Sequence, residues 1–246
     1  MKCEFSELSF TFCVMHDFLN LYNSLNNYKL TPIFPTQIEE NKHGYDVKLQ
    51  CGIIPIFFQF KVSEKIIKSN GSFWNYHRGS YFKFNLYDPV ISNQHNTLVD
   101  LAQNPANQVY YCAPLFNQNN ELSDCFSKQT ICSKTLAIDC QYLNSISSGR
   151  HCISCSYSND PIIFMHSQVF KINNVILLNQ LIEKRLSTNP VYKSNKQLVT
   201  FIKNQVQPLS SVEDNLVYRK LLIKYGIITI LLCDNDMMTN DIHHDV

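Results

Sequence analysis

The chain has 246 residues, of which 45% are hydrophobic and 17% charged, with 21 basic and 20 acidic side chains. This composition excludes wholesale disorder, because a disordered chain combines low hydrophobicity with high net charge. A formal net charge of +1 argues against a protein that coats polyanions by electrostatics alone, but it is compatible with an enzyme that carries one local basic patch.

The first predicted element is an amphipathic helix over residues 4–26. Its apolar residues recur at steps of three and four: Phe5, Leu8, Phe12, Met15, Leu19 and Tyr22. The elements predicted after it are, in chain order, strands at 45–49, 54–62 and 81–87, a helix at 92–103, a strand at 108–116, a helix at 120–134, strands at 136–143, 151–157 and 162–172, helices at 175–186, 196–205 and 212–225, and a strand at 227–233. The predicted fold class is α/β, with a mixed central sheet flanked by helices in residues 1–172 and a mostly helical C-terminal extension in residues 173–246.

The ten cysteines do not indicate a disulfide framework, because several lie in apolar runs such as residues 12–15 and 110–113, where a free thiol acts as a small buried hydrophobe. Glu4 and Glu7 stand where the apolar segment of a secretory signal would begin. The longest clean apolar run, residues 226–233, is far shorter than the roughly 20 residues that span a bilayer. The sequence therefore predicts a cytoplasmic protein with reduced thiols and no membrane partner.

Three polar side chains of the predicted hairpin could meet at one place. Gln59 and Lys61 lie two residues apart on the second strand, so they project from the same face. Asp46 begins the first strand, and a turn near residues 51–53 would bring it opposite Gln59 or Lys61. This set suits phosphodiester hydrolysis, because carboxylate and amide oxygens bind Mg²⁺ and a lysine can orient water and offset charge on the phosphate. The same residues also occur on ordinary solvated strand faces, so a structural role stays open.

The arrangement resembles the PD-(D/E)xK nuclease superfamily. Asp46, followed after twelve residues by Gln59-Phe60-Lys61, is most similar to the Mrr-like restriction endonucleases, in which glutamine takes the first place of the strand motif (QxK). The predicted order of helix, hairpin, helix and strand in residues 4–116 also fits that family. Two features depart from the family pattern: no proline precedes Asp46, and an additional strand intervenes at 81–87.

The resemblance implies a restriction-endonuclease-like core and a Mg²⁺-dependent nuclease in a defence or mobile-element setting, with DNA as the expected nucleic-acid partner. Asp46 would be a metal ligand. Gln59 would be a second metal ligand or a residue that positions water. Lys61 would assist the attacking water and stabilise the transition state.

The family usually has a further acid earlier in the chain. On the predicted first helix, Glu7 or Glu4 could fill that role. If residues 35–41 are helical, Glu40 or its neighbour Glu39 is the alternative, with Glu40 as a metal ligand beside Asp46 and Gln59.

Two groups of residues are predicted to contact nucleic acid. One is a predicted loop whose aromatic and basic side chains could stack on bases and bind phosphates: Lys65, Lys68, Trp74 and Arg78. The other is Gln94 and His95 at the start of the helix at 92–103, because a helix N-terminus favours anions. The structural alternatives are a small apolar cluster under the loop and a polar capping turn with a hydrogen-bonded histidine.

Several enzyme classes are disfavoured by missing motifs. The sequence contains no glycine-rich phosphate loop, Gly-x-Ser-x-Gly elbow or His-Glu-x-x-His pair, which argues against nucleotide-driven motors, serine hydrolases and zincin proteases. The alternative to a nuclease is a catalytically inactive module on the same fold that binds nucleic acid or protein, since glutamine in place of an acid removes the charge of a metal ligand. A purely structural subunit is the third possibility.

Overall fold

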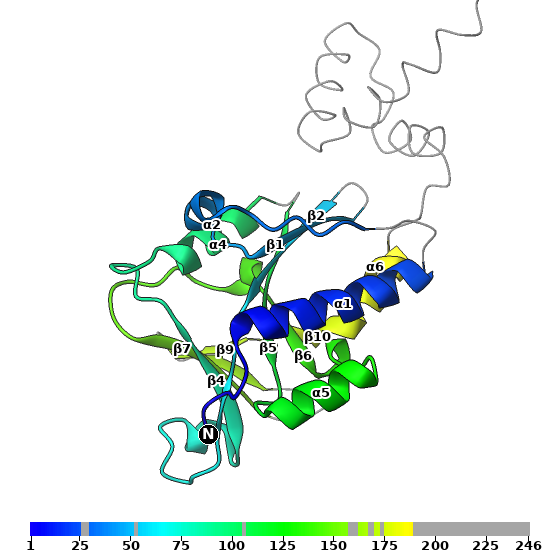
Figure 1. Cartoon of the computed structure of the whole chain (residues 1–246). Helices are drawn as coiled ribbons and strands as arrows, with labels where there is room; N and C mark the ends of the chain where they lie inside the picture. The colour runs from blue at the N-terminus through cyan, green and yellow to red at the C-terminus, as the bar shows by residue number, and fades with distance from the viewer. Residues whose placement is uncertain are drawn as a thin grey trace, which may run out of the picture. The chain divides into compact units, whose positions relative to one another are not determined.

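The structure is a computed structural model, and it describes residues 1–25, 30–51, 54–104, 107–156, 162–166, 170–172 and 175–188. These residues form a mixed α/β body with two five-stranded sheets and several helices (Figure 1). The elements predicted at 196–205, 212–225 and 227–233, and with them most of the predicted C-terminal extension, lie outside the described residues.

The first sheet has the strand order β1-β2-β5-β6-β10. Its strands are β1 (Val47–Cys51), β2 (Ile54–Phe60), β5 (Gln108–Pro114), β6 (Thr135–Asp139) and β10 (Val175–Leu177). β2 and β5 run parallel, whereas β6 pairs antiparallel with both β5 and β10. Parallel neighbours need a crossover connection, and the one between β2 and β5 contains helix α4 (Gln94–Ala102). The presence of both parallel and antiparallel pairs confirms that the sheet is mixed, as predicted.

The sequence predicts one central sheet, but the described residues form two. The second sheet is antiparallel throughout, with the order β3-β4-β7-β8-β9. Its strands are β3 (Glu64–Ile66), β4 (Tyr81–Leu86), β7 (His151–Ser156), β8 (Ile163–Met165) and β9 (Phe170–Ile172). Because β4 joins this second sheet, the additional strand predicted at 81–87 leaves β2 and β5 adjacent in the first sheet.

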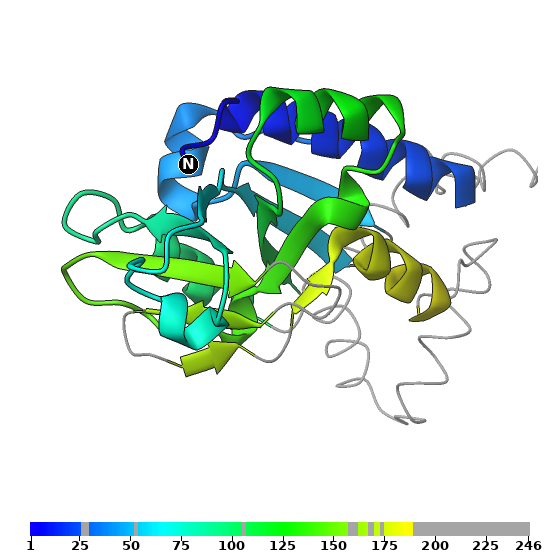
Figure 2. The ribbon, with the colours of Figure 1, turned by 90° about the horizontal axis from the view of Figure 1, so that it is seen from below.

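The two faces of the first sheet are covered differently (Figure 2). Three helices pack on one face: α1 (Glu7–Leu25), α5 (Asn119–Ser127) and α6 (Leu178–Thr188). The other face packs against α4 and the second sheet. Side chains alternate along β2, so Phe58 and Phe60 enter the helical core while Phe57 enters the core shared with the second sheet.

Helix α1 buries only part of the predicted stripe: Phe5 and Met15 lie in the core, and Leu19 and Tyr22 pack against it. Leu8 and Phe12 are 78% and 63% exposed, whereas Phe10 and Phe18 are buried and contact Phe60 and Phe58 edge-on. The helix carries apolar residues at many angles around its axis, so the three- and four-residue spacing fits two overlapping stripes. Packing against the phenylalanines of β2 selects between them.

Other predicted elements divide differently. The helix at 120–134 is α5 followed by a 3₁₀ turn, η1 (Cys132–Lys134), and the strand at 136–143 is β6 followed by η2 (Cys140–Tyr142). The predicted strand at 162–172 is β8 and β9, and the predicted helix at 175–186 begins as β10 before continuing as α6. Because β10 pairs with β6, residues 175–188 belong to the same body as the strands before them.

Two further findings concern the cysteines and the described helices. Eight cysteines are free thiols in the part of the chain that the structure describes: Cys3, Cys13, Cys112, Cys125, Cys132, Cys140, Cys152 and Cys155. Among the described helices, none has the length and apolar character needed to cross a membrane.

Candidate active site

Asp46 lies between helix α2 (Gln37–His43) and strand β1. Helix α2 starts with a capping box, in which Thr36 Oγ1 accepts the backbone N–H of Glu39 and the Glu39 carboxylate accepts the N–H of Thr36. It ends at Gly44, whose φ of 78° lies in the left-handed region that favours glycine. A Cβ at Gly44 would lie 2.9 Å from the carbonyl oxygen of Gln94, so the glycine also allows α2 to approach α4 closely. This corner fixes the backbone just before Asp46.

The structure brings Asp46 and Gln59 together, as the hairpin pattern predicts. The Asp46 N–H donates to the Phe58 carbonyl at 2.9 Å, which places its carboxylate beside the end of β2. Asp46 Oδ2 accepts two hydrogen bonds, from the Phe60 backbone N–H at 2.7 Å and from Gln59 Nε2 at 2.8 Å. The carboxylate is therefore held in one orientation by β2.

Two glutamines connect this carboxylate to Lys61. Gln59 is fully buried, and its Oε1 accepts a hydrogen bond from Gln94 Nε2 at 3.1 Å. Gln94 Oε1 in turn accepts one from Lys61 Nζ at 3.0 Å. The Gln59 amide nitrogen faces Asp46 and its oxygen accepts from Gln94, so one lone pair of Oε1 remains; that Gln59 binds a metal ion or positions water stays a prediction. Gln94, predicted as a phosphate contact, instead joins the two halves of the cluster.

Lys61 is only 6% exposed. The backbone N–H of Lys61 donates to the Cys112 carbonyl at 2.9 Å, which continues the pairing with β5 beyond the end of β2. Its Nζ lies 5.0 Å from the ring centroid of Tyr87, a cation–π contact. An ammonium has three N–H groups, so those not directed at Gln94 can bind an oxygen of a substrate.

Of the four acids considered for the additional acidic position, Glu7 and Glu40 remain as candidates. Glu7 begins α1, and its carboxylate accepts a hydrogen bond from the Val62 backbone N–H. Glu40 lies on α2, which confirms that this segment is helical. The other two acids are engaged elsewhere, since Glu39 closes the capping box and Glu4 is exposed and accepts the Asn119 N–H at 3.0 Å.

The charges of the cluster act on one another. Burial raises the pKa of the Asp46 carboxyl from 3.8 to about 7; the Phe60 N–H opposes this rise, and the nearby Glu7 carboxylate adds to it. Lys61 lowers this pKa and Glu40 raises it. Burial also raises the pKa of Glu7, against the attraction of Lys61. Acids crowded in a buried site therefore resist ionisation, and a bound cation would relieve this.

The donor atoms at this site suit Mg²⁺ in type. Asp46 Oδ1 accepts no hydrogen bond from any residue that the structure describes, so it is free to bind a cation. Glu7 and Glu40 are near enough to raise the pKa of Asp46, and a carboxylate from either one is the type of ligand that Mg²⁺ prefers. Within the described residues, no three His, Cys, Asp or Glu side chains are grouped as a preformed metal site. Mg²⁺ usually keeps several waters and binds through one or two protein carboxylates, so the donors present fit it.

Most of the predicted nucleic-acid contacts lie at the other end of β4 from Lys61. The loop that carries Trp74 and Arg78 precedes β4, whereas Tyr87 follows it. Six residues of strand, at about 3.4 Å each, separate these points by about 20 Å. The loop packs on the second sheet through Phe73, which stacks on His166 with ring centroids 3.4 Å apart. It thus forms a small apolar cluster, while Arg78 remains exposed.

The two remaining basic residues of this group lie on β3 and in the loop after it. Lys65 is on β3, and its Nζ lies 5.5 Å from the ring centroid of Phe82. Lys68 is exposed in the loop that follows β3. In the part of the chain that the structure describes, neither side chain forms a hydrogen bond or ion pair with the cluster around Asp46.

His95 is a core residue and does not face a phosphate. It is buried, with Nδ1 within 3.2 Å of the Tyr111 hydroxyl and Nε2 within 3.0 Å of the Asn144 carbonyl. Burial lowers the pKa of its imidazole, so the neutral ring is favoured. The structure therefore shows the predicted alternative for His95, a hydrogen-bonded histidine with a structural role.

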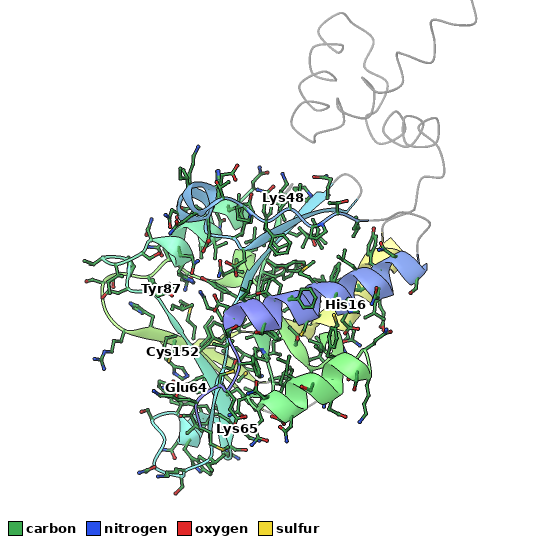
Figure 3. All side chains as sticks on the ribbon, in the orientation of Figure 1. His16, Lys48, Glu64, Lys65, Tyr87 and Cys152 are labelled. Atoms are coloured by element: carbon green, nitrogen blue, oxygen red, sulfur yellow. The ribbon has the colours of Figure 1, made fainter. Side chains whose placement is uncertain are left out.

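One residue at the site was missed by sequence reasoning. Tyr87 follows an alternating strand, and its contact with Lys61 could have been suspected from that alternation, because Lys83, Asn85 and Tyr87 share the outer face. Figure 3 labels Tyr87 on this side of the second sheet. The position of Lys61 relative to this face depends on tertiary packing.

Comparisons of the chain with protein-family models, with curated proteins and with solved structures find no match. The interpretation of the site therefore depends on its own geometry.

Proposed function

We propose that the protein is a metal-dependent nuclease that hydrolyses phosphodiester bonds at this cluster. The observation that carries the proposal is the hydrogen-bond chain between Asp46 and Lys61 through two glutamine amides. The two amides hold the charges of Asp46 and Lys61 apart, which leaves Asp46 Oδ1 and N–H groups of Lys61 for a cation and a substrate.

We further propose a restriction-endonuclease-like core, which the sequence resemblance implies. The order α1, β1, β2, α4 and β5 supports it, together with the parallel pairing of β2 and β5. Support also comes from the contact between Asp46 and Gln59, the first residue of the QxK motif. Glu7 on α1 is in the position where the resemblance expects an earlier acid.

Asp46, together with either Glu7 or Glu40, would hold Mg²⁺. When bound, the ion supplies positive charge against the charge that develops on the phosphate, and it makes water easier to deprotonate. Gln59 keeps Asp46 in place by donating to Oδ2, so that Oδ1 stays available.

Lys61 would stabilise the transition state by donating hydrogen bonds to a phosphate oxygen. Gln94 and the Tyr87 ring fix its ammonium, so no reorganisation is needed when charge develops. Because the side chain is almost completely buried, its interaction with the phosphate is screened less than it would be at the surface.

The test is cleavage of supercoiled plasmid and of single-stranded DNA by the full chain with Mg²⁺. Asp46→Asn and Lys61→Met should each lower the rate by about 100-fold or more, the usual effect of removing one catalytic group. Lys48→Met is a matched control, because Lys48, labelled in Figure 3, lies on β1 with Nζ 5.6 Å from the ring centroid of Phe57 and not from that of Tyr87. This control should cleave at the wild-type rate.

Equal rates for the wild type, Asp46→Asn and Lys61→Met would refute the assigned roles. A wild-type protein that binds DNA but does not cleave it with Mg²⁺ would refute the nuclease proposal. That second result would instead favour the inactive binding module, for which the engaged Gln59 oxygen is the supporting observation.

A further inference from the structure

The outer face of β4 presents a row of polar and aromatic side chains. Lys83, Asn85 and Tyr87 project toward solvent, because the apolar residues between them are buried in the core. The strand pairing places Glu64 opposite Lys83 and Cys152 opposite Asn85. Figure 3 shows the labelled Tyr87, Cys152 and Glu64 following one another along this side of the sheet. At about 3.4 Å per residue, the row from Lys83 to Tyr87 extends over about 14 Å.

A pocket of about 310 Å³ adjoins this row. One wall is β4 at Lys83 and Asn85, a second is residues 62–64, and a third is the N-terminal segment with Lys2. Its volume is at the lower end of the range for small-ligand sites, which suits a single nucleotide better than a duplex. Among the lining residues, Lys2 and Lys83 are basic and Glu64 is acidic.

The pocket and the candidate active site share a stretch of chain. Val62 lines the pocket, and its N–H binds the carboxylate of Glu7. At the other end of the row, the Tyr87 ring contacts the ammonium of Lys61 and yet is 53% exposed. One chain of nucleotides could therefore contact Tyr87, Lys61 and the pocket together.

We propose that the outer face of β4 is a track for single-stranded nucleic acid. A base beside the scissile phosphate stacks on the exposed ring of Tyr87, and a neighbouring nucleotide enters the pocket with its phosphate at Lys83. The inference rests on the proposed nuclease function and names the substrate class of that site.

The burial of Lys61 favours a single strand over a duplex, and the ion pair of Lys83 leaves that residue available to a phosphate. Only 6% of Lys61 is exposed, and a flexible strand can adapt to so small a target more easily than a stiff duplex with a persistence length of about 50 nm. The Lys83–Glu64 pair, at 3.4 Å, is partly exposed on both sides. Such pairs contribute little to stability, so Lys83 can exchange Glu64 for a phosphate.

The stacking contact is tested by fluorescence anisotropy of the full chain with a labelled oligothymidylate of about 12 nucleotides, in EDTA to prevent cleavage. Tyr87→Leu should weaken binding at least about fivefold, the lower end of the effect of losing one stacked base. Tyr87→Phe keeps the ring and should bind as the wild type does. Tyr142→Leu is the matched control, because Tyr142 is 50% exposed but lies on η2.

The phosphate contact is tested by the salt dependence of the same binding. Lys83→Gln should lower the slope of log affinity against log salt by about 0.7, the value for one phosphate contact on a single strand. Lys128→Gln is the control, since Lys128 is also in a surface ion pair, with Asp124 at 2.7 Å, but lies on the segment after α5. The control should leave the slope unchanged.

Wild-type affinity of Tyr87→Leu for the oligonucleotide would overturn the track, as would tighter binding of a duplex of the same length. These outcomes are distinct from failure of the nuclease proposal. Strand binding that depends on Tyr87, without cleavage in Mg²⁺, would keep the track and refute the nuclease. Cleavage of single strands at the same rate by the wild type and Tyr87→Leu would keep the nuclease and refute the track.

Discussion

Removing the charge of Asp46 is expected to stabilise the protein above pH 7. Burial raises the pKa of this carboxyl from 3.8 to about 7, so the folded protein holds the proton more tightly than the unfolded chain does. The unfolded chain therefore loses the proton first as the pH rises, and ionising the folded state costs free energy. The cost is absent below about pH 4, grows between the two pKa values and is complete above about pH 7.

The size of the effect follows from the two pKa values. A tenfold change in proton affinity corresponds to about 1.4 kcal/mol, so the rise from 3.8 to about 7 corresponds to about 4 kcal/mol. Of this, about 3 kcal/mol develops between pH 5 and pH 8. An asparagine at this position keeps an oxygen for the Phe60 N–H and carries no charge, so the stability of Asp46→Asn relative to the wild type should rise by that amount over the same interval.

Urea unfolding of the wild type and of Asp46→Asn at pH 5, 6, 7 and 8 in EDTA measures this difference. Asp100→Asn is the control, because Asp100 is an exposed acid on α4. The stability difference between this control and the wild type should not change over the same pH range.

A difference between Asp46→Asn and the wild type that is constant with pH, or that changes in favour of the wild type as the pH rises, would refute the reasoning. Mg²⁺ provides a second check at pH 8. An ion bound at Asp46 offsets the cost of its charge, so Mg²⁺ should stabilise the wild type and have no such effect on Asp46→Asn.

Two predictions concern the corner that positions Asp46. Gly44→Ala should destabilise the protein by about 1–3 kcal/mol in urea unfolding, because the new Cβ would lie 2.9 Å from the Gln94 carbonyl oxygen at a positive φ. Gly79→Ala, whose Cβ would have its nearest contact at 4.0 Å, should change stability by less than about 0.5 kcal/mol. Thr36→Ala removes the side chain that caps α2 and should cost about 1 kcal/mol in the same assay; an unchanged value would show that the Glu39 bonds alone maintain this helix end.

The meeting of Asp46 and Gln59 could be predicted because strands alternate with a period of two. Once Phe58 and Phe60 are assigned to the core, Gln59 must project from the opposite face of β2, and a one-residue slip would bury the wrong set. The hairpin then limits how far Asp46 can lie from Gln59. Local pattern therefore sufficed for this part of the site.

Helical residues were harder to assign, because neighbours on a helix point about 100° apart and sequence alone does not say which one faces the site. Gln94 and His95 are adjacent at the start of α4, yet Gln94 joins the cluster while His95 points into the core. In α1 the same ambiguity led to Leu8 and Phe12 being assigned to the core although they are exposed. Only the positions of the sheets decide such cases.

The glutamine at position 59 is consistent with the charges around it. A carboxylate there would be fully buried and about as close to Asp46 Oδ2 as the amide nitrogen is now, at 2.8 Å. Two acids at this separation share a proton, which would leave Asp46 less able to bind a cation near neutral pH. The amide avoids this repulsion and fixes Asp46, but it brings no negative charge to the metal. Under the proposed nuclease function, a second carboxylate must then come from Glu7 or Glu40, so that proposal requires one of these two helical residues in a way that a binding module would not.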